Sequence, residues 1–232
     1  DEIRSRGLGD VYKRQDKPAL IMAGSGDVIT HQELNELSNQ GAQLFRSLGL
    51  KPGDSLAFMM ENHKLFFPIA FAAYRSGLKY TAISWRLQAS EVEYIVKDCG
   101  AKVFITSKFL EESAKDLSSS LEGVNKFMLD GESGDFLSYE DAIRNMPNTP
   151  IEDECQGASM LYSSGTTGKP KGVSREIKIS PLPYTPDEED VGLTRVVQGL
   201  YSASEDSVYL SPAPLYHSCL LYTSDAADDK QC

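Results

Sequence analysis

From Asp16 onward, short apolar runs alternate with amphipathic segments, and this alternation limits the possible folds more than any other feature. Runs with strand character occupy residues 19–23, 55–60, 80–83, 102–106, 126–129 and 158–162. Segments with helical spacing of apolar residues occupy 31–48, 62–77, 90–99, 109–121 and 138–145. A strand that is reached through a helix usually lies parallel to the strand before it. We therefore predict an α/β fold with mostly parallel sheets and flanking helices.

Three of these helices have a recognisable start. Thr30 and Glu33 have the spacing of a capping box, in which each side chain accepts a hydrogen bond from the other residue's backbone. Ser90 and Glu93 repeat this spacing, and Asn62 is of the residue type that caps a helix. We expect helices to begin at these three places.

The domain organisation is indicated by composition. Residues 146–154 contain prolines and acidic residues without periodicity, which is typical of a boundary. We predict a first α/β subdomain over residues 16–150 and an incomplete phosphate-loop subdomain over 151–219. Residues 1–15 and 220–232 lack periodicity and are predicted to be non-native or disordered tails, with ordinary frayed termini as the alternative.

Charge and cysteine content exclude some classes of partner. A net charge of -11 disfavours binding to nucleic acid, because an anionic partner would approach against the field of the whole protein. The four cysteines lack metal-ligand or disulfide-framework spacing, so we expect a reducing, cytoplasmic location. No apolar run approaches the roughly 20 residues that cross a bilayer, so we expect neither an integral membrane anchor nor a signal peptide.

The most informative stretch is residues 163–172, which read Ser-Ser-Gly-Thr-Thr-Gly-Lys-Pro-Lys-Gly. Glycines allow close approach of backbone N–H groups, hydroxyls donate to phosphate oxygens, and lysine supplies compact positive charge, so this composition suits a polyphosphate. The stretch differs from a Walker A loop because Pro170, and not Ser or Thr, follows Gly168-Lys169. A flexible surface loop rich in Gly, Ser and Thr is the alternative interpretation.

Residues 161–173 resemble the phosphate-binding signature of the adenylate-forming superfamily, which includes acyl- and aryl-CoA synthetases, luciferases and adenylation domains of peptide synthetases. Residues 49–54, 75–82, 98–102 and 211–217 are similar to other segments of that family, and the resemblance extends over about residues 16–219. Residues 80–95 look closest to fatty acyl-CoA synthetases. Trp85 and Arg86 in this stretch are equally consistent with a packing tryptophan and a surface arginine.

The resemblance implies roles for individual residues. The residues expected to bind the ATP phosphates are Ser163, Ser164, Gly165, Thr166, Thr167, Gly168 and Lys171. Ser163 is the candidate ligand of Mg²⁺, and Lys169 is expected to be a solvated charge. His217, in the sequence Pro-Leu-Tyr-His, is expected beside the acyl pocket, although a lone histidine is more often structural.

The resemblance also implies a reaction. It predicts activation of a carboxylic acid, most simply a fatty acid, by ATP and Mg²⁺ to an acyl adenylate and then to acyl-CoA. Two features depart from the family. Residues 175–190 form a proline-rich, acidic insertion, and the chain stops before the expected Mg²⁺ carboxylate, the ribose-binding residue and the C-terminal catalytic lysine. We therefore expect the chain by itself to be inactive.

Three other functions remain open. One is a phosphate-binding module of a P-loop NTPase or kinase, and the second is a noncatalytic nucleotide-binding or interaction domain. The third is an adenylating enzyme with an acceptor other than CoA.

Overall fold

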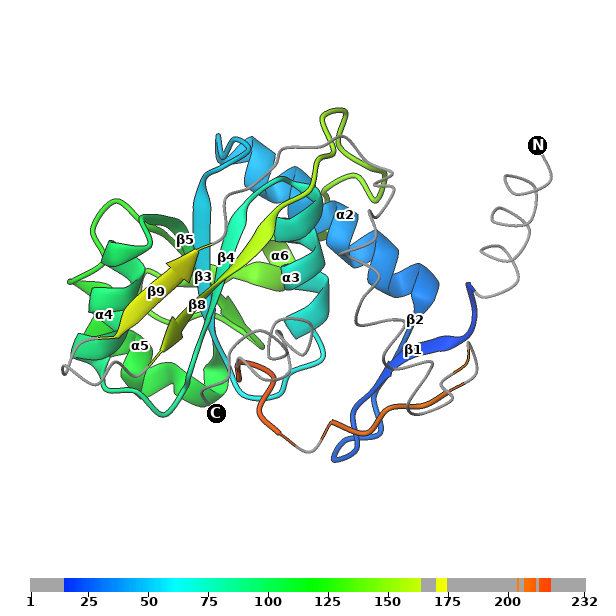
Figure 1. Cartoon of the computed structure of the whole chain (residues 1–232), viewed down its shortest axis with the longest axis horizontal. Coiled ribbons are helices and arrows are strands. Elements are labelled where there is room, and N and C mark those ends of the chain that lie inside the picture. The colour runs from blue at the N-terminus through cyan, green and yellow to red at the C-terminus, as the bar shows by residue number, and fades with distance from the viewer. Residues whose placement is uncertain (1–14, 164–169, 175–203, 205–206, 212, 218–232) are drawn as a thin grey trace.

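The computed structural model describes residues 15–163, 170–174, 204, 207–211 and 213–217 (Figure 1). Within this part, the main sheet is built from β3 (Ser55–Met59), β4 (Lys79–Ile83), β5 (Ala101–Ser107), β6 (Asn125–Leu129), β7 (Leu137–Ser138), β8 (Ala158–Ser163) and β9 (Lys171–Ser174). Their spatial order is β7-β6-β5-β3-β4-β8-β9. All neighbours pair in parallel except β8 and β9, which are antiparallel. The predicted, mostly parallel α/β fold is confirmed.

Helices cover both faces of this sheet. They are α2 (His31–Ser47), α3 (Phe66–Arg75), α4 (Ala89–Asp98), α5 (Glu111–Ser118) and α6 (Tyr139–Arg144), with a short 3-10 helix, η1 (Lys108–Leu110), before α5. Figure 1 shows α4 and α5 on one face and α2, α3 and α6 on the other. β1 (Pro18–Ile21) and β2 (Val28–Thr30) form a separate antiparallel hairpin.

The sheet separates two hydrophobic core clusters. In β5, Val103 and Ile105 belong to the cluster under α2, α3 and α6, whereas Phe104 between them belongs to the cluster under α4 and α5. Successive side chains of a strand point to opposite faces. Because both faces are covered, the central strands read as continuous apolar runs, and this makes them visible in the sequence.

The capping box at the start of α2 is confirmed. The Thr30 hydroxyl accepts a hydrogen bond from the Glu33 amide at 3.2 Å, and the Glu33 carboxylate accepts one from the Thr30 amide at 2.8 Å. The second bond favours the ionised carboxylate and lowers the pKa of Glu33.

The predicted start of α4 at Ser90 is wrong by two residues. Gln88 is the N-cap, and its amide donates to the carboxylate of Glu91 at 2.8 Å. Glu93 instead pairs with a lysine one turn later. Two overlapping spacings were possible in this stretch, and the earlier one is used.

The prediction that Asn62 caps a helix is also wrong. α3 begins at Phe66, and its N-cap is Leu65. Pro68 explains the difference, because proline lacks an N–H and is tolerated only in the first turn of a helix. A helix that started just after Asn62 would have Pro68 in its interior.

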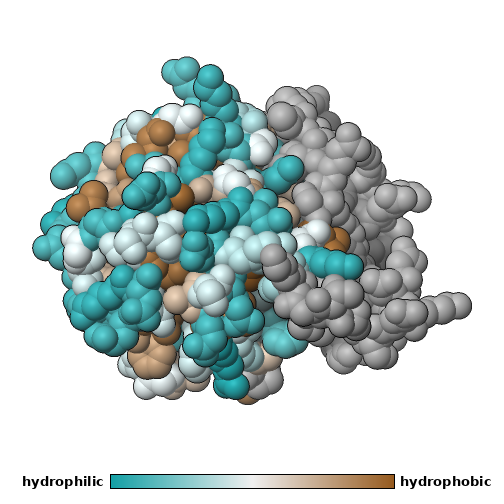
Figure 2. All heavy atoms as spheres, turned by 90° about the vertical axis from the view of Figure 1, so that its left-hand side faces the viewer, coloured by the Kyte–Doolittle hydropathy of each residue, from teal (hydrophilic) through white to brown (hydrophobic). Residues whose placement is uncertain are grey.

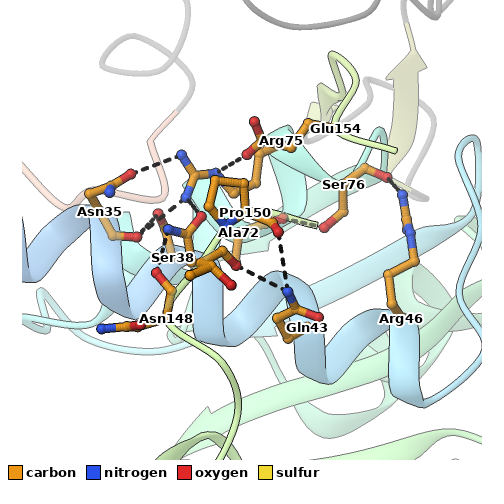
Figure 3. Close-up of polar contacts among 12 residues, drawn as sticks. Asn35, Ser38, Gln43, Arg46, Ala72, Arg75, Ser76, Asn148, Pro150 and Glu154 are labelled. Atoms are coloured by element: carbon orange, nitrogen blue, oxygen red, sulfur yellow. Dashed lines mark hydrogen bonds and ion pairs between the residues drawn. The ribbon is translucent and has the colours of Figure 1, made fainter. Parts of the chain in front are cut away.

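Polar side chains of α2 and α3 hold residues 146–154, the predicted boundary segment (Figure 3). Asn39 donates to the Asn148 carbonyl at 2.7 Å, and Gln43 donates to the Thr149 carbonyl at 3.0 Å. The segment leads into β8, which pairs with β4 in the same sheet. The division of the chain at residue 150 stays a prediction.

Two ion pairs reinforce this attachment. Arg46 pairs with Asp153, and Arg75 pairs with Glu154, each at 3.0 Å. Burial lowers the pKa of Arg75, while the charge of Glu154 acts in the opposite direction. The start of β8 is thereby fixed relative to α2 and α3.

Among the described residues, those on the side of α4 and α5 form a mainly hydrophilic surface (Figure 2). Figure 2 shows this side, where hydrophilic residues predominate and hydrophobic ones are scattered. None of the helices in the described ranges combines the length and the hydropathy that a bilayer crossing requires.

Candidate functional site

The predicted phosphate-binding stretch joins two paired strands. Ser163, the last residue of β8, lies opposite Lys171, the first residue of β9. The two ends of the intervening segment are therefore neighbours in space. The predicted phosphate ligands between them, Ser164, Gly165, Thr166, Thr167 and Gly168, lie outside the described residues, as does Lys169. For Ser163 the structure describes the backbone, so its contact with Mg²⁺ stays a prediction.

Lys171 is exposed at the start of β9. Within the part of the chain that the structure describes, it has no ion-pair partner, so its ammonium group is available to a ligand. The element that follows the loop is an antiparallel strand. In a P-loop NTPase a helix follows instead, and its N-terminus binds the phosphates. The hairpin of β8 and β9 thus excludes the P-loop arrangement.

Gly172 has a steric role in this hairpin. A Cβ atom at this position would lie 2.6 Å from Met160 Cε and 2.9 Å from Tyr162 Cζ. Real Cβ atoms essentially never approach so closely, so the two side chains occupy the space that a larger residue would need. Glycine is required because the Tyr162 ring covers the neighbouring strand.

Tyr162 is held in turn by α4. Its hydroxyl donates to the Asp98 carboxylate at 2.5 Å. Burial, and then the hydrogen bond to Asp98, raise the pKa of Tyr162 well above its usual range. This contact fastens the base of the hairpin to the C-terminal end of α4.

His217 is exposed, and its amide donates to the Pro214 carbonyl at 3.0 Å, closing a turn. Leu215 and Tyr216 pack against the core cluster under α2, α3 and α6. As described above, Ser163 and Lys171 lie opposite each other in the hairpin of β8 and β9. Between described atoms, no hydrogen bond joins either residue to His217. The expected place of His217 beside an acyl pocket stays a prediction.

Asn62 holds this turn in place. Its side-chain oxygen accepts a hydrogen bond from the Leu215 amide at 2.8 Å, and its side-chain nitrogen donates to the Ala213 carbonyl at 3.3 Å. Sequence reasoning missed this contact. The available signal was Pro68, which already argued that Asn62 is too far from the helix to cap it.

Glu61, His63 and Asp130 lie next to this contact and resemble a metal site. Their potential ligand atoms all lie within 4.8 Å of one another, the one such group among the described residues. Glu61 and Asp130 follow β3 and β6, and Ser107 ends β5, so the group lies at the carboxyl edge of the parallel strands. Ligands of open α/β sheets often bind at this edge.

The hydrogen bonds of His63 argue against a metal at this place. The Leu65 amide donates to His63 Nδ1 at 3.1 Å, so Nδ1 is the acceptor and Nε2 carries the proton. Nε2 then donates to Asp130 at 3.1 Å, and Ser107 donates to Glu61 at 2.5 Å. A protonated Nε2 has no lone pair for a metal ion. These residues form a hydrogen-bonded network that joins three strand ends.

Trp85 and Arg86 behave as a packing tryptophan and a surface arginine. Trp85 is half-buried and makes an edge-on contact with Phe109, with ring centroids 6.0 Å apart. The Arg86 guanidinium lies 5.1 Å from the Trp85 ring centroid and is exposed. The arrangement is a cation–π contact at the surface.

Comparison with known proteins gives one family. The profile described as AMP-binding enzyme matches residues 10–224. The fatty acid–[acyl-carrier-protein] ligase ScoC of Streptomyces coeruleorubidus is 27% identical over 164 residues, which cover 67% of this chain and 29% of that protein. The oxalate–CoA ligase of Arabidopsis thaliana is 28% identical over 216 residues, which cover 90% of this chain and 40% of that protein.

A solved structure has the same fold. The inhibitor-bound N-terminal domain of FACL13 from Mycobacterium tuberculosis superimposes with a TM-score of 0.67 at 24% identity, over 94% of this chain and 52% of that one. The chain spans only 29% to 40% of the length of the two curated relatives.

Proposed function

Because the chain belongs to the AMP-binding enzyme family, whose members form adenylates, we propose that the whole protein activates a carboxylic acid with ATP. One carboxylate oxygen attacks the α-phosphorus, the bond from that phosphorus to the bridging oxygen breaks, and pyrophosphate leaves. The product is an acyl adenylate, which a thiol then attacks at the acyl carbon to release AMP.

The β8–β9 hairpin is the observation that carries this proposal. It brings Ser163 and Lys171 together across the strand pair and leaves Lys171 exposed beside the end of the signature segment. A lysine in this position can neutralise charge that accumulates on departing pyrophosphate, and a contact of this kind acts mainly in the transition state.

The proposal includes Mg²⁺, which when bound would supply further positive charge next to the ATP phosphates. Hydroxyl oxygens such as that of Ser163 are ligands of the kind that Mg²⁺ accepts. In the described part of the chain, β8 and β9 hold the two ends of the loop together. The hydroxyl side chains of residues 163–172 are the candidate ligands of Mg²⁺.

The acid and the acceptor are the finer part of the proposal. The resemblance of residues 80–95 to fatty acyl-CoA synthetases supports a fatty acid as substrate and CoA as acceptor. The printed names of the relatives differ in both respects, with a fatty acid and an acyl carrier protein in one, and oxalate and CoA in the other. An adenylating enzyme with another acceptor is therefore the alternative that the test includes.

We also propose a cytoplasmic location. Cys99 and Cys155 are buried, free thiols, and burial raises the pKa of both. Free cysteines of this kind suit a reducing compartment.

The test is to supply the whole protein with ATP, Mg²⁺ and a panel of fatty, aromatic and short dicarboxylic acids. AMP release that needs both an acid and CoA supports the proposal, and the preferred acid identifies the substrate. If the acyl adenylate forms but its acyl group is transferred only to a carrier protein, the acceptor is the carrier protein and not CoA. ATP binding without adenylate from any acid would favour a noncatalytic module.

A further inference from the structure

The tripeptide Glu61-Asn62-His63, which follows β3, connects three separate parts of the chain. Glu61 accepts a hydrogen bond from Ser107 at the end of β5, and His63 donates to Asp130 after β6. Asn62, between them, binds the turn of residues 213–217. We propose that Asn62 is a positioning residue for His217. This inference rests on the proposed function and on the prediction that His217 lies beside the bound acid.

The backbone at Asn62 is fixed from both sides. The side chain of His63 is buried and uses both ring nitrogens, Nδ1 toward the Leu65 amide and Nε2 toward Asp130. Glu61 is tied to Ser107 at 2.5 Å. Because its two neighbours are held by the ends of β5 and β6, the amide group of Asn62 projects from a rigid support.

The contact that Asn62 makes is specific for an amide. Its oxygen accepts a hydrogen bond from the Leu215 amide, and its nitrogen donates one to the Ala213 carbonyl. One side chain therefore binds two backbone groups of the turn. A carboxylate can make the first bond but has no proton for the second. An aliphatic side chain can make neither.

The turn is prepared for this contact. Pro214, between Ala213 and Leu215, fixes its own backbone and disfavours helical geometry at Ala213. Leu215 and Tyr216 pack on the core cluster, and the turn ends with the bond from the His217 amide to the Pro214 carbonyl. The position of the His217 backbone is thereby linked to Asn62, more than 150 residues earlier in the chain.

The first measurement is hydrogen exchange of residues 213–217 in the whole protein. Asn62→Ala removes both bonds, and exchange at the Leu215 amide should become about tenfold faster. Asn62→Asp keeps the acceptor for that amide and should fall between Ala and the wild type. Asn125→Asp is the matched control, because Asn125 also donates to a backbone carbonyl, that of Lys102, but at the start of β6. Unchanged exchange in Asn62→Ala would overturn the inference.

The second measurement is steady-state adenylation by the same variants and by His217→Ala. If Asn62 positions His217, Asn62→Ala lowers kcat/KM for the acid about tenfold and leaves kcat/KM for ATP unchanged. Asn125→Asp should change neither. A purely structural role of Asn62 would lower kcat/KM for the acid and for ATP by the same factor through loss of folded protein, with both KM values unchanged.

The outcomes separate this inference from the proposed function. A loss for the acid in His217→Ala without one in Asn62→Ala overturns the positioning role alone. No loss in either variant, with an active wild type, overturns the role of His217 and the positioning role with it. An inactive wild type contradicts the proposed function, whereas the exchange measurement still shows whether Asn62 holds the turn.

Discussion

The hydroxyl of Tyr162 donates a 2.5 Å hydrogen bond to the carboxylate of Asp98, and through it the strand before the phosphate signature is fastened to the end of α4. Tyr162 pairs with Gly172 across the hairpin. Tyr162 therefore contacts both α4 and β9, the strand that carries Lys171.

Tyr162→Phe should lower the free energy of unfolding by about 0.5–1.5 kcal/mol. A hydrogen bond to a charged group contributes more to stability when it is buried. Asp98 is exposed, however, so water replaces the Tyr162 hydroxyl as its hydrogen-bond donor. Urea unfolding measures the effect. Tyr209→Phe is the control, because Tyr209 is 77% exposed and should tolerate the change. Equal effects of the two substitutions would contradict the role of the bond.

Gly172→Ala should lower stability by about 1–3 kcal/mol, because the added methyl overlaps with Met160 and Tyr162. Met160 is flexible at its end, whereas the Tyr162 ring is held by Asp98. Removing that bond lets the ring move, so the double variant with Tyr162→Phe should be destabilised less than the sum of the single changes. Strict additivity in urea unfolding would show that the ring does not resist the methyl group.

Tyr139→Phe should leave stability unchanged or raise it by about 1 kcal/mol. The Tyr139 hydroxyl is buried and has no hydrogen-bond partner among the described atoms, while its ring packs edge-on against Phe127. Phenylalanine keeps the ring contact and removes an unpaired polar group. Clear destabilisation on calorimetry would mean that the hydroxyl has a partner, such as a buried water molecule.

The stability of the wild type should fall as the pH rises above about 10. Burial raises the pKa of Tyr139, and burial together with Asp98 raises that of Tyr162, so both stay protonated in the folded protein. In the unfolded chain they lose their protons near pH 10, which favours unfolding above that pH. Tyr139→Phe and Tyr162→Phe should each show a shallower decline of the urea midpoint between pH 9 and 11 than the wild type. Declines parallel to that of the wild type would contradict the raised pKa values of these tyrosines.

The chain by itself should form no acyl adenylate above the background of its Lys171→Ala variant. It carries the signature segment, but groups around the rest of the transition state are expected from parts of the relatives that it does not span. Calorimetry with ATP and Mg²⁺ should give only weak binding. Micromolar affinity together with acid-dependent pyrophosphate exchange would show that this chain is sufficient.

The sheet was predictable because its central strands are buried on both faces. Strands such as β5, which follows Gly100 directly, therefore appear as apolar runs, and the helix after Thr30 appears through a local capping pattern. The end of α5 was less clear, since the predicted helix over 109–121 is a 3-10 turn followed by a helix that ends at Ser118. Local spacing predicts which elements exist better than it predicts their ends.

The site was less predictable because its contacts join distant residues. β9 has little strand character in its sequence and exists through pairing with β8, while Asn62 meets a turn more than 150 residues away. Neither relationship leaves a local pattern. The family signature located Lys171, but the antiparallel partner that leaves it exposed could not be read from the residues around it.

The most direct test of the central claim is acid-dependent exchange of pyrophosphate into ATP by the whole protein and by its two signature-lysine variants. Lys171→Ala should slow exchange by about 10²–10³, with little change in the KM for the acid, because the contact acts on departing pyrophosphate. Lys169→Ala, the matched control, should stay within a few-fold of the wild type. Equal losses at the two positions, or full activity of Lys171→Ala, would contradict the assignment of the hairpin lysine to the phosphates.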